Sequence, residues 1–287
     1  MSKKPKLSIY NAADSLFKKI AYQWNKYNLP PYRPVEEDIR IMEKAVAKWG
    51  NRCPDQKYRA LLWGVTPEIA DMSWPDGTEL LAVDRSEDMI SEVWPGDIDG
   101  FRKACCCNWL HASSVIKNPV SIVIGDGCFN SNKYPDEWRA LFVATHRVLK
   151  ERGVFIMRFI LGSENRESTG NVFKELMENR IGSFHMFKLR LAISMQEDVQ
   201  KGARQHNMWQ TWKDASIDKA ELMKITGWTK EAINTIDNWE GLDGRFWSPT
   251  HRELKQVFSD IFKEIDITFP KYEMGEYCPT LVFEKKA

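Results

Sequence analysis

Short apolar segments alternate with amphipathic segments along the middle of this 287-residue chain. The apolar segments have the length and composition of buried strands, and the segments between them have the spacing of helices. This alternation is typical of an α/β fold with a parallel sheet. The expected elements are strand 59–64, helix 67–73, strand 79–84, helix 87–94, strands 102–108 and 120–126, helix 136–150 and strand 153–160.

Outside this alternation the sequence changes character twice. Residues 1–34 end in a proline-rich stretch, which favours an extended lead-in or lid over a helix. Residues 183–244 are charged, rich in tryptophan and punctuated by glycines, and they contain no segment typical of a strand. We therefore expect an inserted helical cap there. Residues 35–182 and 245–287 then form the sheet domain.

The two ends of the sheet domain carry helix and strand patterns of their own. Apolar residues spaced by three and four predict an amphipathic helix over 35–49. Near the C-terminus, Thr250 and Glu253 can form a capping box at the start of another helix. We expect two last strands, joined as an antiparallel hairpin at the edge of the sheet, near 264–270 and 279–284.

Composition and charge exclude several classes of partner. Lys and Arg number 41 against 40 for Asp and Glu, so no global charge would attract nucleic acid or an anionic membrane. No apolar run approaches the roughly 18 residues that a membrane span needs, and no signal-peptide core follows Lys6. We expect a soluble cytoplasmic protein with a small-molecule partner. A modest basic patch, of the kind usual on a solvated helix face, contains Lys188, Arg190, Lys201 and Arg204.

The six cysteines show neither a paired Cys-x-x-Cys spacing nor the spacing of a secreted disulfide framework. Cys105, Cys106 and Cys107 are consecutive, with His111 nearby. Adjacent residues of a strand point to opposite faces, so these side chains cannot all hold one ion. We expect reduced thiols and no metal site.

Two strand ends carry residues that point to a ligand. The first strand runs into Gly64, where the backbone can pass close to a bound molecule, and Thr66 as N-cap with Pro67 starts a helix. The next strand ends in Asp84, and a carboxylate there can accept hydrogen bonds from both hydroxyls of a ribose. The alternative is that Asp84 caps the following helix, but Ser86 is the better N-cap.

These landmarks resemble the class I S-adenosylmethionine-dependent methyltransferases. The resemblance covers roughly Val35 to Leu161 and the last two strands, and the segment Leu62–Glu68 looks like the Gly-Val-Thr-Pro-Glu form of the family's first motif. It keeps one glycine of the usual glycine-rich turn. The resemblance implies a Rossmann-like sheet of seven mostly parallel strands, S-adenosylmethionine as cofactor, and methyl transfer to a small-molecule acceptor.

The resemblance also implies which residues bind the cofactor. Asp84 would hold the ribose, Asn108 at the end of the third strand would lie beside the adenine amine, and Trp109 would cover the adenine ring. Met89, on the first turn of the helix after Asp84, would pack on the adenine. Core packing is the alternative for Trp109 and for Met89. Asp126 lies where the family's fourth strand meets cofactor and acceptor, and two flanking glycines favour a carboxylate that points into the cleft. The full expected set is Gly64, Val65, Thr66, Asp84, Arg85, Met89, Asn108, Trp109, Asp126 and Gly127.

A sulfonium methyl group is already activated, so such an enzyme needs chiefly to align the acceptor and to remove a proton where required. Candidates for the base are Asp126, His185 and His206, with His146 and Tyr10 behind them. A lone histidine in a helix is more often structural.

Two other functions stay open at this stage. A nicotinamide-dependent dehydrogenase also has an acidic residue about twenty residues after a glycine turn, but its turn should contain three glycines. Here Val65, Thr66 and Pro67 follow Gly64. The second alternative is a degenerate methyltransferase that binds cofactor, or nothing, and serves as a scaffold.

Overall fold

The structure is a computed structural model that describes residues 29–52 and 58–286 together with Lys18, Ala21, Tyr22 and Trp24. Within these residues, seven strands form one sheet: β1 (Arg59–Trp63), β2 (Glu79–Asp84), β3 (Arg102–Cys106), β4 (Val120–Asp126), β5 (Leu149–Arg158), β8 (Phe262–Thr268) and β9 (Thr280–Lys285). Their order is β3-β2-β1-β4-β5-β9-β8. β1 to β5 run parallel, whereas β9 runs antiparallel to both β5 and β8. The predicted seven-stranded Rossmann-like sheet with an antiparallel C-terminal pair is confirmed.

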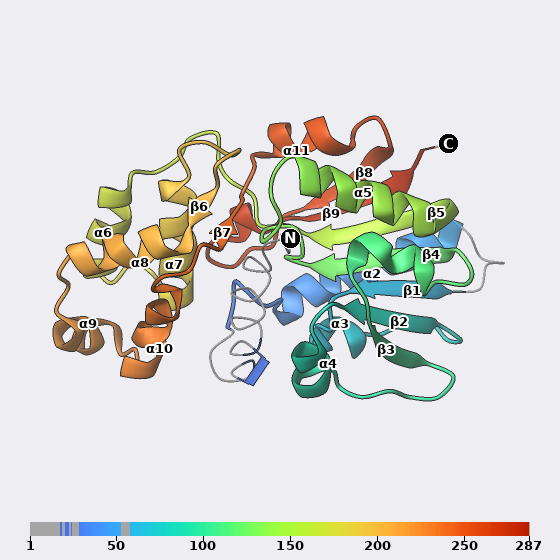
Figure 1. Cartoon of the computed structure of the whole chain (residues 1–287), viewed down its shortest axis with the longest axis horizontal. Helices are drawn as coiled ribbons and strands as arrows, with labels where there is room; N and C mark the ends of the chain where they lie inside the picture. The colour runs from blue at the N-terminus through green and yellow to red at the C-terminus, as the bar shows by residue number, and fades with distance from the viewer. Residues whose placement is uncertain (1–17, 19–20, 23, 25–28, 53–57, 287) are drawn as a thin grey trace, which may run out of the picture.

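Helices cover both faces of this sheet (Figure 1). They are α2 (Glu36–Arg52), α3 (Pro67–Ala70), α4 (Glu87–Val93), α5 (Asp136–Val148) and α11 (His251–Phe258), with the 3-10 helices η1 (Trp109–Ser114) and η3 (Gly275–Tyr277). Along β1, Leu61 and Trp63 share a core with α5 and α11, whereas Ala60 and Leu62 share a second core with α2, α3 and α4. Alternate side chains of a strand point to opposite faces, which explains why the whole strand is apolar.

Several predicted features of these elements agree with the structure. β2 and β4 have their predicted bounds, and the capping box at α11 is present, because Thr250 and Glu253 each accept the other's backbone N–H. β5 begins at Leu149 rather than at residue 153. The reason is that Leu149 already pairs with Val120 of β4.

Residues 169–246 form a helical cap, coloured yellow to orange at the left of Figure 1. It contains α6 (Thr169–Met177), α7 (Phe184–Met195), α8 (Gln205–Asp214), α9 (Lys219–Thr226), α10 (Lys230–Asn234) and η2 (Thr235–Trp239), with the two-residue strands β6 (Ala203–Arg204) and β7 (Arg245–Phe246). The cap has its own core around Trp212, to which α6 contributes Val172 and Leu176. The helical segment therefore starts before residue 183. The antiparallel β6–β7 pair is a departure from the strand-free cap that we expected.

The N-terminal lead-in is not extended throughout. Lys18, Ala21, Tyr22 and Trp24 are helical, and Ala21 is buried in the core shared with α2, α3 and α4. Residues 29–34, which we call the arm, lead from there to α2. Tyr32 of the arm packs against a small cluster formed by the end of β5, α7 and the loop before β9. The arm thus contacts both the sheet domain and the cap.

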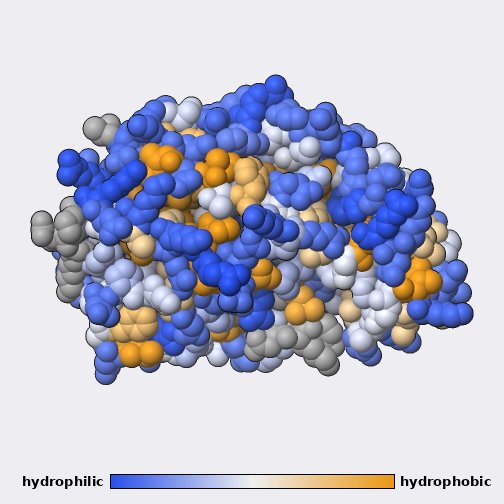
Figure 2. Space-filling model, turned by 180° about the vertical axis from the view of Figure 1, so that it is seen from behind, coloured by the Kyte–Doolittle hydropathy of each residue, from blue (hydrophilic) through white to orange (hydrophobic). Residues whose placement is uncertain are grey.

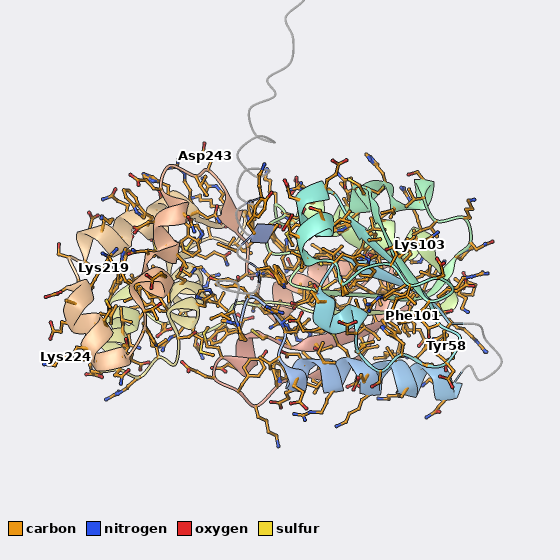
Figure 3. All side chains as sticks on the ribbon, turned by 90° about the horizontal axis from the view of Figure 1, so that it is seen from below. Tyr58, Phe101, Lys103, Lys219, Lys224 and Asp243 are labelled. Carbon is orange, nitrogen blue, oxygen red and sulfur yellow. The ribbon has the colours of Figure 1, made fainter. Side chains whose placement is uncertain are left out.

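None of the helices in the described ranges is long and apolar enough to cross a membrane. Figure 2 shows hydrophobic residues in separate patches among hydrophilic ones on the face opposite to that of Figure 1. In the cap, Lys219 and Lys224 lie at the end farthest from the sheet domain (Figure 3).

Candidate functional site

The turn between β1 and α3 brings the backbone next to the end of β2. Gly64 follows β1 with a φ of +83°, a left-handed conformation that glycine adopts without strain. Its N–H donates to the Val83 carbonyl at 2.9 Å, and a Cβ at this position would lie 3.8 Å from Oδ2 of Asp84. Gly64 and the Asp84 carboxylate are therefore neighbours at the carboxyl edge of the sheet, where ligands of parallel sheets bind.

The caps of the two helices that follow these strands differ from each other. Pro67 is at the first position of α3 as predicted, but the Thr66 side chain is buried and makes no capping hydrogen bond. Thr66 therefore occupies the predicted N-cap position, but its hydroxyl does not cap the helix, and Pro67 at the first helical position defines the helix start. Oγ of Ser86 accepts the backbone N–H of Met89 at 3.3 Å, so the prediction that Ser86 caps α4 is confirmed.

Asp84 is buried at the end of β2, with 8 % of its surface exposed. Its Oδ1 accepts the backbone N–H of Ser86 at 2.8 Å, which orients the carboxylate. Burial raises the pKa of Asp84 to about 6, although the backbone N–H of Ser86 and the nearby Arg85 oppose this shift. A carboxylate in such surroundings gains from any ligand that donates hydrogen bonds to it.

The residues after β3 lie beside this edge. β3 ends at Cys106, so Asn108 is not the last residue of a strand as we expected; it is the N-cap of η1, and its Oδ1 accepts the Leu110 N–H at 3.0 Å. Nε1 of Trp109 donates to the Val83 carbonyl at 2.7 Å, which ties the indole to the end of β2. Met89 packs in the core and is 7 % exposed. The proposed roles of these residues toward adenine remain predictions.

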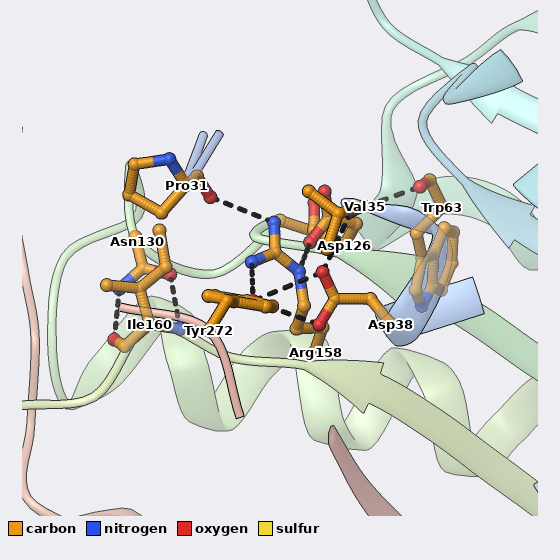
Figure 4. A network of polar contacts seen from close by, with 10 residues as sticks. Pro31, Val35, Asp38, Trp63, Asp126, Asn130, Arg158, Ile160 and Tyr272 are labelled. Atoms are coloured by element: carbon orange, nitrogen blue, oxygen red, sulfur yellow. Dashed lines mark hydrogen bonds and ion pairs between the residues drawn. The ribbon is translucent and has the colours of Figure 1, made fainter. Parts of the chain in front are cut away.

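Asp126, at the end of β4, forms a buried ion pair with Arg158, the last residue of β5 (Figure 4). Nε of Arg158 donates to Oδ1 of Asp126 at 2.5 Å, and the two side chains are 1 % and 4 % exposed. Burial raises the pKa of Asp126, although Arg158 opposes this shift. The Asp126 carboxylate, which we expected to point into the cleft, is therefore covered by the Arg158 guanidinium. Loss of one partner of such a pair costs about 3–5 kcal/mol.

Arg158 extends this pair into a network that holds the arm (Figure 4). Its Nη2 donates to the Pro31 carbonyl at 2.9 Å, and its Nη1 donates to the Tyr272 hydroxyl at 3.3 Å. Tyr272 in turn donates to Oδ1 of Asp38 at 2.9 Å, and Oδ2 of Asp38 accepts the Val35 N–H at 2.9 Å. The arm, α2 and the loop before β9 are thereby joined to the carboxyl edge of the sheet.

Glu68, the second residue of α3, adds a carboxylate to this edge. Arg33 of the arm pairs with its Oε1, whereas Oε2 is buried and has no hydrogen-bond partner among the described residues. Burial makes the largest contribution to the raised pKa of Asp126, and the charges of Asp38 and Glu68 raise it further. These three carboxylates therefore lie near one another. A buried oxygen without a partner costs free energy unless a donor reaches it. Glu68 therefore marks a place where a ligand N–H group would be stabilised.

Two of the predicted histidine candidates lie in the cap. His185 on α7 is 3 % exposed, and its ring lies 5.9 Å from that of Tyr32 in the arm. His206 on α8 is tied into the cap instead, because its Nδ1 accepts the Gly241 N–H at 3.0 Å. Of the two, His185 is the one that contacts the arm.

The other candidates lie elsewhere. Nε2 of His146, on α5, is 3.1 Å from the Lys286 carbonyl, near the end of the described chain and not at the carboxyl edge. Tyr10 falls outside the described residues. In the parts of the chain that the structure describes, no group of three or more His, Cys, Asp or Glu side chains could hold a metal ion, and the cysteines are free.

Sequence reasoning missed Arg158, Glu68 and Asp38, although two of them carry a signal. Arg158 ends an otherwise apolar strand, and Asp38 lies on the buried stripe of α2 with Met42 and Val46. A charged residue in either position needs a partner. A small groove lies between α2 and the strands β5, β8 and β9, and its walls contain none of the residues of the carboxyl edge described above.

The direction of β9 decides between the two kinds of sheet considered for this chain. The mostly parallel sheet of dinucleotide-binding dehydrogenases has the order 3-2-1-4-5-6. Here an antiparallel strand, β9, is inserted between β5 and β8. The fold is that of the class I S-adenosylmethionine-dependent methyltransferases.

Solved structures are similar to this fold at low sequence identity. A protein of Rhodobacter sphaeroides described as a zinc-dependent alcohol dehydrogenase is 11 % identical, with a TM-score of 0.58 and coverage of 98 % of this chain and 100 % of that one. Magnesium protoporphyrin IX methyltransferase of Synechocystis PCC 6803, with bound S-adenosylmethionine, is 9 % identical, with a TM-score of 0.50 and coverage of 99 % and 100 %. At these identities the likeness concerns the fold alone. No protein-family profile and no curated protein matches the chain.

Proposed function

We propose that this protein is an S-adenosylmethionine-dependent methyltransferase that acts on a small-molecule acceptor. The observation that carries the proposal is the neighbourhood of Gly64 and the buried Asp84 carboxylate at the carboxyl edge of a methyltransferase sheet. The glycine leaves room for a ligand to approach the backbone closely. The carboxylate offers the acceptor that two ribose hydroxyls require.

The residues around this edge fit the other parts of the cofactor. Asn108 and Trp109, which lie beside the end of β2, would flank the adenine. The methionine end carries an ammonium group, and β1 ends in Leu62 and Trp63 without an acidic residue. We assign the ammonium to Glu68, whose buried Oε2 has no partner among the described residues. The remaining members of the proposed cofactor site are Val65, Thr66, Arg85, Met89 and Gly127.

When bound, S-adenosylmethionine supplies a methyl group that its sulfonium centre has already activated. The task of the protein is then to hold the acceptor in line and to exclude water. The cap lies beyond the carboxyl ends of β4 and β5 (Figure 1), and the arm contacts both the cap and the sheet domain. Arg158 pairs with the Asp126 carboxylate, so we do not assign Asp126 as the base. Because Arg158 also donates to the Pro31 carbonyl, we assign to this pair the role of holding the arm against the carboxyl edge.

A small molecule is favoured as acceptor over a nucleic acid. Arg190 pairs with Glu167, and Arg204 pairs with Asp243 at the surface of the cap. Lys188 is buried. Of the four basic residues that form a patch in the sequence, these three are thus paired or covered, which leaves little charge for a phosphate backbone.

Isothermal titration calorimetry tests the proposal. We expect saturable binding of S-adenosylhomocysteine, the product form of the cofactor, and no saturable binding of NAD⁺ under the same conditions. Binding of NAD⁺ alone would favour the dehydrogenase. If neither molecule binds, the chain is a scaffold that has lost its cofactor, and the proposed function is wrong.

A further inference from the structure

Lys188 is a buried cation that lacks an acidic partner within the described part of the chain. It lies on α7 with 6 % of its surface exposed, and its Nζ donates to Oγ1 of Thr235 at 2.9 Å. Burial lowers the pKa of Lys188 to about 7, and no carboxylate opposes that shift. Lysine is almost never buried unless it is paired, because an unpaired charge in the interior is costly.

Aromatic side chains surround the Lys188 ammonium. Nζ lies 5.0 Å from the ring centre of Trp239, on η2, and 5.6 Å from that of Tyr32, in the arm. The Tyr32 ring also stacks on Phe246 at 6.1 Å and lies 5.9 Å from the His185 ring. Contacts with aromatic faces stabilise a cation only modestly. They offset only part of the free-energy cost of burying the charge.

The Tyr32 hydroxyl is a second polar group of this cluster whose hydrogen bonding is incomplete. It is buried and makes no hydrogen bond among the described residues. Burial raises the pKa of Tyr32, so the phenol keeps its proton and is a donor at neutral pH. The ammonium of Lys188 can donate three hydrogen bonds, of which Thr235 accepts one. The cluster therefore presents several donors and needs an acceptor, and an anion supplies both the acceptor and the missing charge.

The cluster lies next to the carboxyl edge of the sheet. Pro31, which precedes Tyr32, accepts a hydrogen bond from Arg158 at the end of β5. Lys188 belongs to the cap, and Tyr32 to the arm. These are the two parts of the chain that lie on the side from which an acceptor would approach the cofactor.

We propose that Lys188 and Tyr32 form an anion-binding subsite of the acceptor site, which takes the carboxylate or phosphate group of a small acidic acceptor. The assignment of this anion to the acceptor rests on the proposed methyl transfer. The anion enters where the Tyr32 ring now faces the ammonium, between arm and cap, and the aromatic walls favour a flat or apolar body next to the charged group.

Calorimetric titrations of the full chain with acetate, benzoate and inorganic phosphate at pH 6 test this subsite. At least one of the three should bind saturably, and Lys188→Met should weaken that binding tenfold or more, as the loss of a charged hydrogen bond implies. Tyr32→Phe should weaken it about fivefold. The methionine variant should fold, because Oγ1 of Thr235 keeps its hydrogen bond to the Ala232 carbonyl at 2.7 Å. Lys213→Met is the matched control, since Lys213 is exposed and lies 5.9 Å from the Trp209 ring.

The affinity for a carboxylate should also be about tenfold higher at pH 6 than at pH 8.5, because the Lys188 ammonium loses its proton across that range. Acetate and benzoate keep their charge between these values. The other titratable or charged groups next to the cluster are His185, whose ring lies 5.9 Å from that of Tyr32, Arg158, which donates to the Pro31 carbonyl, and Cys278, which contributes to the raised pKa of Tyr32. His185→Gln, measured in the same way, should retain the pH dependence.

Three results would overturn the subsite: no binding of any of the three anions, equal binding to wild type and Lys188→Met, or equal affinity at both pH values. The proposed function is judged separately, by S-adenosylhomocysteine. Lys188→Met should bind S-adenosylhomocysteine as the wild type does. If neither protein binds it while the anions bind as expected, the subsite stands and methyl transfer is wrong.

Discussion

Replacing Asp84 with asparagine should stabilise the ligand-free protein at neutral and alkaline pH. Asparagine keeps an oxygen for the Ser86 N–H but has no charge to bury. Burial raises the pKa of Asp84 from 3.8 to about 6, so its contribution to stability is fully present below pH 3.8 and is lost as the pH rises through 6. A shift of about two pKa units corresponds to about 3 kcal/mol of unfolding free energy at pH 8 and to about half of that at pH 5.

Urea denaturation followed by circular dichroism at pH 5 and pH 8 measures this difference. Asp84→Asn should exceed the wild type in unfolding free energy by up to about 3 kcal/mol at pH 8, and the excess should shrink by about 1.5 kcal/mol at pH 5. Glu87→Gln, at an exposed position three residues further on, controls for the loss of a charge. An excess that is the same at both pH values would show that the carboxylate is not the buried, perturbed group described here.

Three further substitutions test separate parts of the site. Glu68→Gln should weaken S-adenosylhomocysteine binding about tenfold, as the loss of a charged hydrogen bond implies. It should leave unchanged the binding of 5′-methylthioadenosine, which lacks the amino acid part. Equal losses for both ligands would contradict the assignment of Glu68 to the ammonium. Arg158→Met should lower the unfolding free energy by about 3–5 kcal/mol, because it leaves the Asp126 charge buried without its partner, and adding Asp126→Asn should recover part of that loss in urea titrations. No recovery would mean that the pair is not the source of the loss. Gly64→Ala should cost roughly 1–2 kcal/mol in the same titrations, because alanine is strained at a φ of +83°. An unchanged unfolding free energy would show that the turn is not left-handed in solution.

The sheet was largely predictable because its signals are local. Each strand is a short apolar run bounded by turn residues, and the bounds of β2 and β4 follow from that pattern alone. Helix caps are local as well, which is why Ser86 and the Thr250–Glu253 box were recognised. Thr66 shows the limit of this reasoning, since it occupies the N-cap position of α3 while its side chain is buried and makes no capping hydrogen bond.

The cap and the polar network were harder to predict because their contacts span long stretches of sequence. α6 is short, and its Val172 and Leu176 pack into the cap and not onto the sheet, so its apolar stripe did not reveal where the cap begins. β6 and β7 have two residues each, and the helices α8, α9, α10 and η2 separate them in the sequence. The Asp126–Arg158 pair joins two strands that are neighbours only in the folded sheet. Spacing placed Asp126 at the end of β4 but could not show that a guanidinium covers its carboxylate.

Calorimetry at pH 7.5 can compare the affinities of the wild type and of Asp84→Ala for S-adenosylhomocysteine. This comparison tests directly whether Asp84 belongs to a site for S-adenosylmethionine. We expect the wild type to bind and the alanine variant to bind more weakly by about 1.5–3 kcal/mol, the usual contribution of hydrogen bonds to a charged group, while its circular dichroism spectrum is unchanged. Equal affinities would remove Asp84 from the cofactor site. Absence of binding by the wild type would contradict the proposed S-adenosylmethionine-dependent function.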